Sequence, residues 1–113
     1  MANSSWEDFL ELQIEEAGLP KPVREYRFLT TRRFRFDFAW PNHLFAVEVD
    51  GNVYGHSRHT SGTGFSKDCE KFALAAIEGY RVIRITSGQV NKGDGIGWIK
   101  EYFKRQVENK IGQ

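Results

Sequence analysis

Hydrophobic residues recur along the chain with two periods, three to four residues in some segments and two residues in others. The first period is typical of amphipathic helices and the second of strands with one buried face. Helices are predicted for residues 5–17, 66–78 and 96–109. Strands are predicted for residues 24–29, 33–40, 44–50 and 81–86. A hairpin followed by a strand–helix–strand crossover indicates an α/β fold, with a central mixed four-stranded sheet flanked by three helices in the order αβββαβα.

The first predicted helix is amphipathic and acidic. Serines precede it as possible N-caps, and the sequence Gly18-Leu19-Pro20 ends it. Its apolar stripe consists of Trp6, Phe9, Leu10, Ile14 and Ala17. Glu7 borders this stripe and can therefore reach the sheet beneath the helix, whereas Glu11 lies further round.

The second predicted helix follows a glycine-rich segment, residues 51–65, that has no regular period and is expected to form a loop. Its predicted buried stripe consists of Cys69, Phe72, Ala73, Ala76 and Ile77. This assignment turns Lys71 away from the protein interior. The last helix is expected to direct Trp98, Tyr102, Phe103 and Val107 inward.

Alternation in two consecutive strands places acidic residues on one face of the sheet. In residues 33–40, one side holds Phe34, Phe36, Phe38 and Trp40, and the other holds Arg33, Arg35, Asp37 and Ala39. Glu48 and Asp50 lie two residues apart and share a face of the next strand. If the two strands pair through the turn at Pro41, Asp37 lies close to both.

Carboxylates that lie side by side on a sheet repel each other, and a bound cation removes that cost. Hard oxygen ligands in a small cluster suit Mg²⁺, or Mn²⁺ as its substitute. Such an ion can hold a phosphate oxygen and activate a water molecule as a nucleophile. The alternative is that Asp37, Glu48 and Asp50 lie on a solvated face and pair with Arg33 and Arg35.

The net charge of +1 conceals two opposed blocks. Residues 1–17 hold five acidic residues and no Lys or Arg, whereas residues 21–35 hold six basic residues and one acidic residue. The arginines of the predicted hairpin are Arg24, Arg27, Arg32, Arg33 and Arg35. Their positive charges can bind the phosphate backbone of DNA and place it across the carboxylates. The alternative is that they neutralise the acidic first helix within the fold.

Length and composition limit the class of protein. The 113 residues suffice for one domain, and 40% hydrophobic residues suffice for a core. The single cysteine, Cys69, forms no internal disulfide, which fits a reducing, cytoplasmic setting. The sequence contains no apolar run long enough for a membrane helix and no secretory signal core, so a membrane partner is not expected.

The segments Asp37-Phe38-Ala39-Trp40-Pro41 and Phe45-Ala46-Val47-Glu48-Val49-Asp50-Gly51 resemble the core of the PD-(D/E)XK nuclease superfamily. They are most similar to its small branch of very-short-patch-repair-like (Vsr-like) endonucleases and related phage-borne proteins. The resemblance implies a Mg²⁺-dependent DNA endonuclease that leaves a 5′-phosphate. It also implies that Asp37, Glu48 and the Val49 carbonyl bind the metal, and that Glu7 is the auxiliary glutamate of the first helix.

One position departs from the superfamily pattern, because Asp50 stands where the superfamily usually has a lysine. That lysine orients or activates the attacking water. Asp50 can instead contribute to a second metal site, or the base can have moved to His59, Lys67 or Lys71. The predicted orientation of Lys71 counts against that residue. A third alternative is a catalytically inactive nucleic-acid-binding module that retains the nuclease fold.

His56 and His59 offer two further interpretations. With Cys69 they supply three zinc ligands, but a structural zinc site normally needs four. We favour a loop that presents His56, together with Lys67 and Lys71 of the following helix, to DNA in duplex, mismatched or branched form. One such domain has one active site, so cutting both strands requires a homodimer or two visits.

Overall fold

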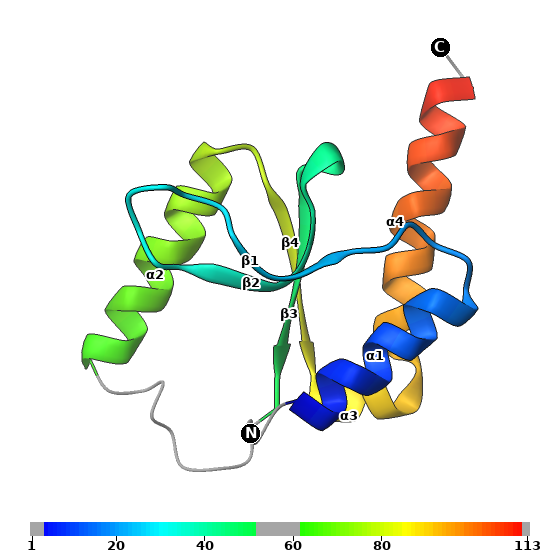
Figure 1. The fold of residues 1–113 in the computed structure, drawn as a ribbon, viewed down its shortest axis with the longest axis horizontal. Helices are drawn as coiled ribbons and strands as arrows, with labels where there is room; N and C mark the ends of the chain where they lie inside the picture. The colour runs from blue at the N-terminus through cyan, green and yellow to red at the C-terminus, as the bar shows by residue number, and fades with distance from the viewer. Residues whose placement is uncertain (1–3, 52–61, 112–113) are drawn as a thin grey trace.

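The computed structural model describes residues 4–51 and 62–111 (Figure 1). The elements in chain order are α1 (Ser4–Glu16), β1 (Val23–Arg27), β2 (Arg35–Trp40), the 3-10 turn η1 (Pro41–His43), β3 (Phe45–Asp50), α2 (Gly62–Ile77), β4 (Arg81–Thr86), α3 (Ser87–Lys92) and α4 (Asp94–Ile111). The predicted α/β class is confirmed. Within the described residues, one helix more than the expected three is present, because the segment before residue 96 forms α3 and the first turn of α4.

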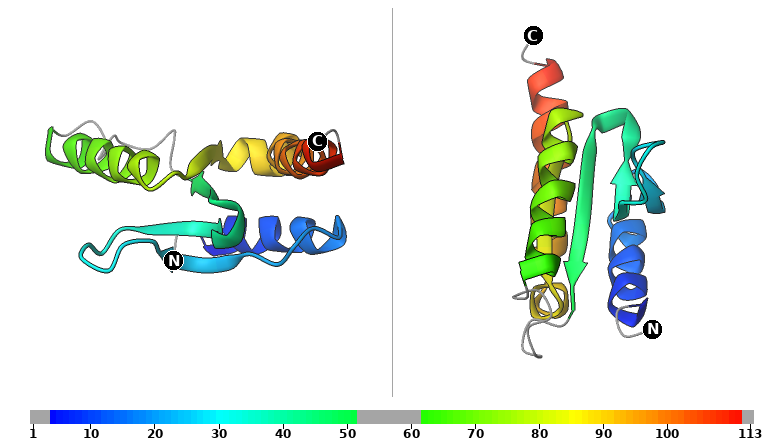
Figure 2. Two further views of the ribbon diagram at one scale, coloured as in Figure 1. Left: turned by 90° about the horizontal axis from the view of Figure 1, so that it is seen from above. Right: turned by 90° about the vertical axis from the view of Figure 1, so that its left-hand side faces the viewer.

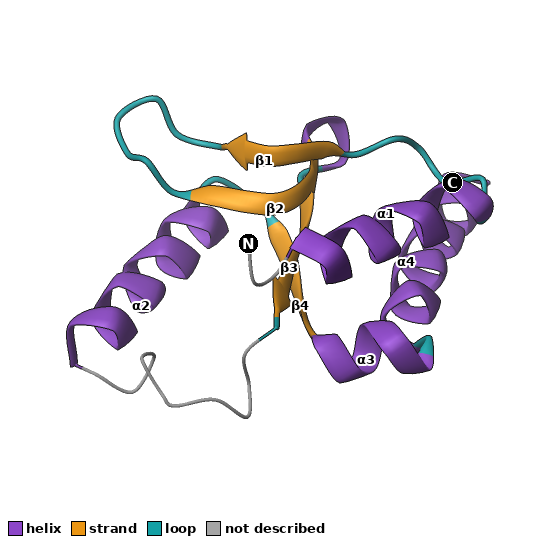
Figure 3. Ribbon diagram, turned by 60° about the horizontal axis from the view of Figure 1, so that its bottom comes forward, coloured by secondary structure: helices purple, strands orange, loops and turns teal. Residues whose placement is uncertain are grey.

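The four strands form one mixed sheet in the order β1-β2-β3-β4 (Figure 3). Antiparallel pairing joins β1 to β2 and β2 to β3, whereas β3 and β4 are parallel. The chain therefore enters β4 by a crossover through α2, as a parallel neighbour requires. Of the elements predicted from sequence, the strand over residues 81–86 has the bounds of β4.

The sheet twists so strongly that the β1–β2 ribbon crosses β3 and β4 in projection (Figure 1). Seen from above, β1, β2 and α1 form one layer, and α2, β4, α3 and α4 form another (Figure 2). The recorded pairing of β2 with β3 runs from Trp40↔Phe45 to Phe38↔Val47 and then stops. Because right-handed twist accumulates from strand to strand, the ends of β2 and β3 move apart beyond this point.

Two groups of buried side chains lie on the sheet. The larger one packs between the strands and helices α1, α3 and α4, and consists of Leu10, Ile14, Phe38, Trp40, Phe45, Val47, Val49, Ile85, Val90, Ile99 and Phe103. The smaller one lies towards α2 and consists of Phe36, Ala39, Ala46 and Ala75. Phe36 and Phe38 were expected on one side of β2 but belong to different groups, because the strand turns away from β3 between them.

Helix α2 differs from its prediction in length and in orientation. It begins at Gly62 rather than Ser66. Its sheet-facing positions are Asp68, Lys71, Phe72 and Ala75, whereas Cys69, Ala73, Ala76 and Ile77 are exposed. The predicted stripe was therefore right for Phe72 and wrong for its other four members. Apolar periodicity misassigned it because the sheet beneath α2 carries acidic groups, which favour a basic side chain on the buried face.

The C-terminal region differs from its prediction in smaller ways. Thr86 caps α3 through a capping box, in which its side chain accepts from the Gln89 N–H and the Gln89 side chain accepts from the Thr86 N–H. Gly93, with φ of 90°, ends α3. In α4, Phe103 is buried as expected, but Trp98 and Val107 are exposed. No helix in the described ranges is long and apolar enough to cross a membrane.

Candidate active site

Two carboxylates occupy the point where β2 and β3 separate. The Asp37 N–H donates to Glu48 Oε2 at 3.1 Å, and the Val49 N–H donates to Asp37 Oδ2 at 2.8 Å. Side-chain oxygens thus accept the backbone N–H groups beyond the last recorded β2–β3 pair. These bonds fix the position and orientation of both carboxylates, and place Asp37 and Glu48 together as the alternation predicted.

Helix α1 brings a third carboxylate to this place. Glu7 is 7% exposed, and one of its oxygens lies within 4.8 Å of oxygens of Asp37 and Glu25. The sequence predicted the approach of Glu7 to the sheet but not the presence of Glu25. Glu25 sits between the pairs Arg24↔Phe38 and Tyr26↔Phe36 and so lies across from Asp37, with φ of 52°. The register of β1 with β2 would have predicted that Glu25 lies near Asp37.

Arg24 connects α1 to this site. Its guanidinium donates to Glu7 at 3.1 Å and to Glu11 at 2.6 Å, and it lies 4.8 Å from the centre of the Phe38 ring. Asp8 contributes a longer ion pair at 3.4 Å. Arg24 therefore neutralises the acidic helix, which is the alternative that the two charge blocks left open, and it orients Glu7.

The position of Lys71 differs most from what the sequence predicted for the site. It was predicted to point away from the interior, but its Nζ lies 2.7 Å from Glu48 Oε1 and its side chain is 14% exposed. The ammonium also lies 5.8 Å from the Phe36 ring centre and 5.5 Å from that of Phe72. The prediction was wrong because it assumed that α2 buries its most apolar stripe.

Asp50 shares the β3 strand with Glu48 but has a different partner. Its carboxylate accepts from Arg84 at 2.9 Å, and Arg84 lies 4.0 Å from Asp68 as well. The described cluster of mutually close ligand atoms consists of Glu7, Glu25 and Asp37, and includes neither Glu48 nor Asp50. The charge of Asp50 is compensated by Arg84.

Burial raises the pKa of each carboxyl group at the centre. The pKa of Glu48 rises to about 7, because burial outweighs the opposing effect of Lys71. Burial also raises the pKa of Asp37, against the hydrogen bond from Val49, and that of Glu7, to which the nearby Asp37 adds. Each carboxylate is thus less stable here than in water. A divalent cation would relieve this cost, and the oxygen donor set fits Mg²⁺ or Mn²⁺.

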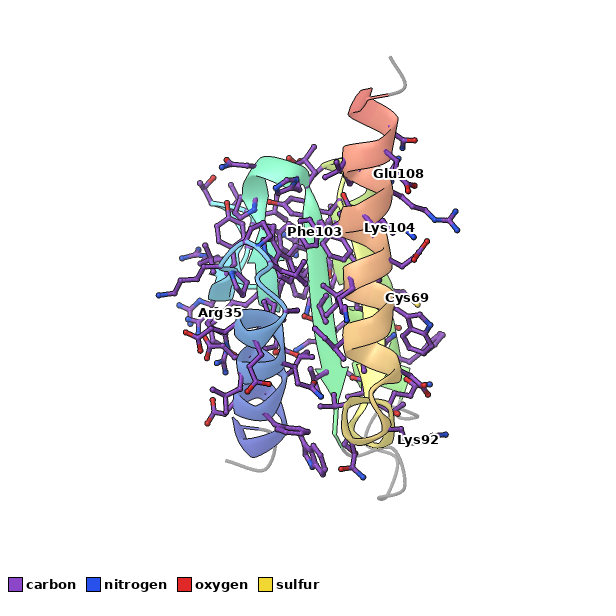
Figure 4. All side chains as sticks on the ribbon, turned by 90° about the vertical axis from the view of Figure 1, so that its right-hand side faces the viewer. Arg35, Cys69, Lys92, Phe103, Lys104 and Glu108 are labelled. Carbon is purple, nitrogen blue, oxygen red and sulfur yellow. The ribbon has the colours of Figure 1, made fainter. Side chains whose placement is uncertain are left out.

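The remaining predicted nucleic-acid-binding residues separate into two sets. Arg27 donates to the carbonyls of Arg32 and Thr30, and Arg32 pairs with Glu70 of α2, so both hold the β1–β2 connection in place. In the described part of the chain, Arg33, Arg35 and Lys67 are exposed and form no ion pair. Figure 4 places Arg35 on the side of the view that holds α1, away from Lys104 and Glu108 of α4.

Two predicted residues, His56 and His59, lie outside the described residues. The zinc interpretation, which the sequence did not favour, therefore stays untested, and its third ligand, Cys69, is exposed. The same holds for a general base supplied by His59.

The fold matches a solved structure, the "Homing Endonuclease I-Bth0305I Catalytic Domain", with a TM-score of 0.68. The two sequences are 20% identical, and the match covers 90% of this chain and 96% of that domain. The fold is that of a nuclease catalytic domain. No protein-family model and no curated protein matches the chain. The nuclease fold expected from the sequence resemblance is thus supported, whereas membership of the PD-(D/E)XK superfamily and of its Vsr-like branch stays a prediction.

Proposed function

We propose that residues 1–113 act as one nuclease domain of the PD-(D/E)XK type, a metal-dependent DNA endonuclease. The observation that carries this proposal is the Asp37–Glu48 pair, two partly buried carboxylates oriented by backbone N–H groups on a nuclease fold. A pair with only a structural role would not need to be adjacent and unfavourably buried. A strongly raised carboxyl pKa, such as that of Glu48, is typical of functional sites.

Asp37, Glu48 and the Val49 carbonyl would hold the metal ion, and Glu7 would add a carboxylate from α1. When bound, the ion supplies Lewis-acid stabilisation of the phosphate charge and lowers the pKa of water. In the hydrolysis, a water oxygen bonds to phosphorus and the P–O3′ bond breaks. The water gives up a proton and the departing O3′ takes one, which leaves a 5′-phosphate and a 3′-hydroxyl. The backbone hydrogen bonds to Asp37 and Glu48 keep the metal ligands in place throughout.

The exposed arginines next to β2 would place DNA over these carboxylates. Arg35 is the first residue of β2, the strand that contains Asp37, and Arg33 lies two residues before Arg35. Neither has an ion-pair partner among the described residues, so both can bind phosphate without breaking an internal contact. Lys67 of α2 offers a further exposed cation. Binding through such contacts weakens as the salt concentration rises.

The test of this function is a cleavage assay with a panel of labelled DNA. Wild type, Asp37→Ala and Glu48→Ala are incubated with duplex, mismatched, branched and single-stranded DNA in Mg²⁺, Mn²⁺ or EDTA. We expect cleavage that requires metal and is lost in both variants. Glu108→Ala, an exposed carboxylate on α4, is the matched control and should cleave as wild type does.

The same assay separates the endonuclease from an inactive nucleic-acid-binding module. Asp50 at the usual lysine position is the observation that favours such a module. An inactive module would bind DNA equally well in Mg²⁺ and EDTA and would not cleave it with any metal. Neither Asp37→Ala nor Glu48→Ala would change its DNA affinity. That result would contradict the catalytic proposal. A homodimer stays a prediction, and sedimentation of the same proteins would test it.

A further inference from the structure

The strand position that carries the superfamily lysine supplies no positive charge to this site. It is occupied by Asp50, whose carboxylate is held by Arg84 at 2.9 Å. Arg84 is itself partly exposed and lies 4.8 Å from the centre of the Phe72 ring. Asp50 therefore does not replace the ammonium, and its carboxylate is paired with Arg84.

Helix α2 supplies a cation to the same carboxylates from another direction. Lys71 is mostly buried, and its ammonium contacts Glu48 Oε1 at 2.7 Å. A lysine is seldom buried unless it is paired, because removing the charge from water is costly. In the described structure, no other basic side chain forms an ion pair with Glu48. The positive charge also opposes the rise in the pKa of Asp37.

The contacts of Glu48 show what this lysine does to the carboxylate. Oε2 accepts from the Asp37 N–H, and Oε1 accepts from Lys71. Each carboxylate oxygen has two lone pairs, so these bonds orient Glu48 without using all of its capacity for a metal. An ammonium has three N–H donors, and Glu48 uses one of them. The other donors are free to reach a water molecule or a phosphate oxygen placed over Glu48.

We infer that Lys71 of α2 performs the task of the superfamily's strand lysine. In this chain Asp50, paired with Arg84, occupies that lysine's position on β3. The inference rests on the proposed endonuclease function. Lys71 aligns Glu48 and, through its remaining donors, holds the attacking water or the phosphate. The aromatic rings of Phe36 and Phe72 flank the ammonium and fix its place.

The experiment compares Lys71→Met with a double variant that moves the ammonium back to the strand. Methionine keeps the length and apolar stem of lysine and removes the charge. We expect Lys71→Met to lower kcat by about 100-fold or more, with KM changed much less. Lys71→Met/Asp50→Lys should recover at least about tenfold of that loss. Lys71→Met/Asp50→Asn is the matched control; it removes the Asp50 charge without adding an ammonium, and it should not recover.

Mn²⁺ binding by calorimetry and the melting temperature supply readouts that do not depend on activity. In Lys71→Met the loss of Mn²⁺ affinity should be much smaller than the loss of kcat, and the melting temperature should show that the variant is folded at the assay temperature. Wild-type cleavage together with an unchanged kcat in Lys71→Met would overturn this inference and leave the endonuclease in place. A kcat loss with an equal loss of Mn²⁺ binding would also overturn it, since Lys71 would then only hold the site together. No cleavage by wild type on any substrate would overturn both proposals.

Discussion

The two sides of the sheet are built on different principles. The side covered by α1, α3 and α4 buries large apolar side chains in contact with each other, among them Phe38, Trp40, Phe45 and Phe103. The side covered by α2 buries one large residue, Phe36, with three alanines, and beyond them it holds the ion pair of Lys71 and Glu48. Stability is thus concentrated on the first side, whereas the candidate site draws Lys71 from α2 on the second side and Glu7 from α1 on the first.

The contrast has a physical origin in β2. From Phe38 to Trp40 the strand pairs with β3, and Phe38 and Trp40 contribute to the larger core. At Asp37 the pairing stops, and carboxylates bond to the backbone instead. A site that must admit an ion and a phosphate cannot also be a close-packed core, so the fold places the site where the β2–β3 pairing ends, next to that core.

Truncation in the larger core should produce the largest loss of stability. Phe45 is fully buried and packs against Trp40 and Tyr102, with ring centres 5.2 Å and 3.8 Å apart. Phe45→Ala removes these contacts and leaves a cavity, so we expect the free energy of unfolding to fall by about 3–5 kcal/mol. Urea denaturation measures it. Phe72→Ala on the α2 side, where the ring is partly exposed, is the comparison and should cost clearly less. Equal losses would mean that both sides are packed alike.

The next effect concerns the pH dependence of the metal-free protein. The pKa of Glu48 is about 7 in the folded protein and 4.5 for the ordinary group, so its protonated form is favoured by folding. Its contribution to stability is complete below pH 4.5 and is lost as the pH rises through 7. The loss amounts to about 3 kcal/mol.

Glu48→Gln keeps the size of the side chain and removes this titration. In EDTA, its free energy of unfolding should fall less than that of wild type between pH 5 and 8. Asp37 and Glu7, whose pKa values are also raised, act in the same direction in both proteins, so a smaller pH dependence remains in the variant. Parallel pH profiles for the two proteins would contradict an unfavourably buried Glu48 carboxylate.

Sequence patterns predicted the first side of the molecule better than the second. Periodicity found the strands and the buried Leu10 and Ile14 of α1, because a large apolar core imposes its period on the residues that fill it. It also found Asp37, Glu48 and Glu7 as neighbours, because alternation and a helical wheel report which face a residue takes.

The errors gather where polar partners decide the packing. The wheel of α2 placed Lys71 outside and Ile77 inside, and the structure reverses both. The attraction between Lys71 and Glu48 joins residues 23 positions apart, and no local period contains it. Glu25 was missed for a related reason, since its approach to Asp37 depends on the register of β1 with β2.

The smallest effect is expected on the outer face of α2, and it tests the reversal directly. Ile77 is 76% exposed, so Ile77→Ser should change the free energy of unfolding by less than about 0.5 kcal/mol. Ile14→Ser is the matched control in α1, where the side chain is 1% exposed and the loss should exceed about 2 kcal/mol. Urea midpoints at two protein concentrations measure both. A loss at Ile77 as large as that at Ile14 would contradict an exposed outer face. If the loss of stability in Ile77→Ser grew with protein concentration, a second copy of the chain would cover α2, and this face would be the interface of the predicted homodimer.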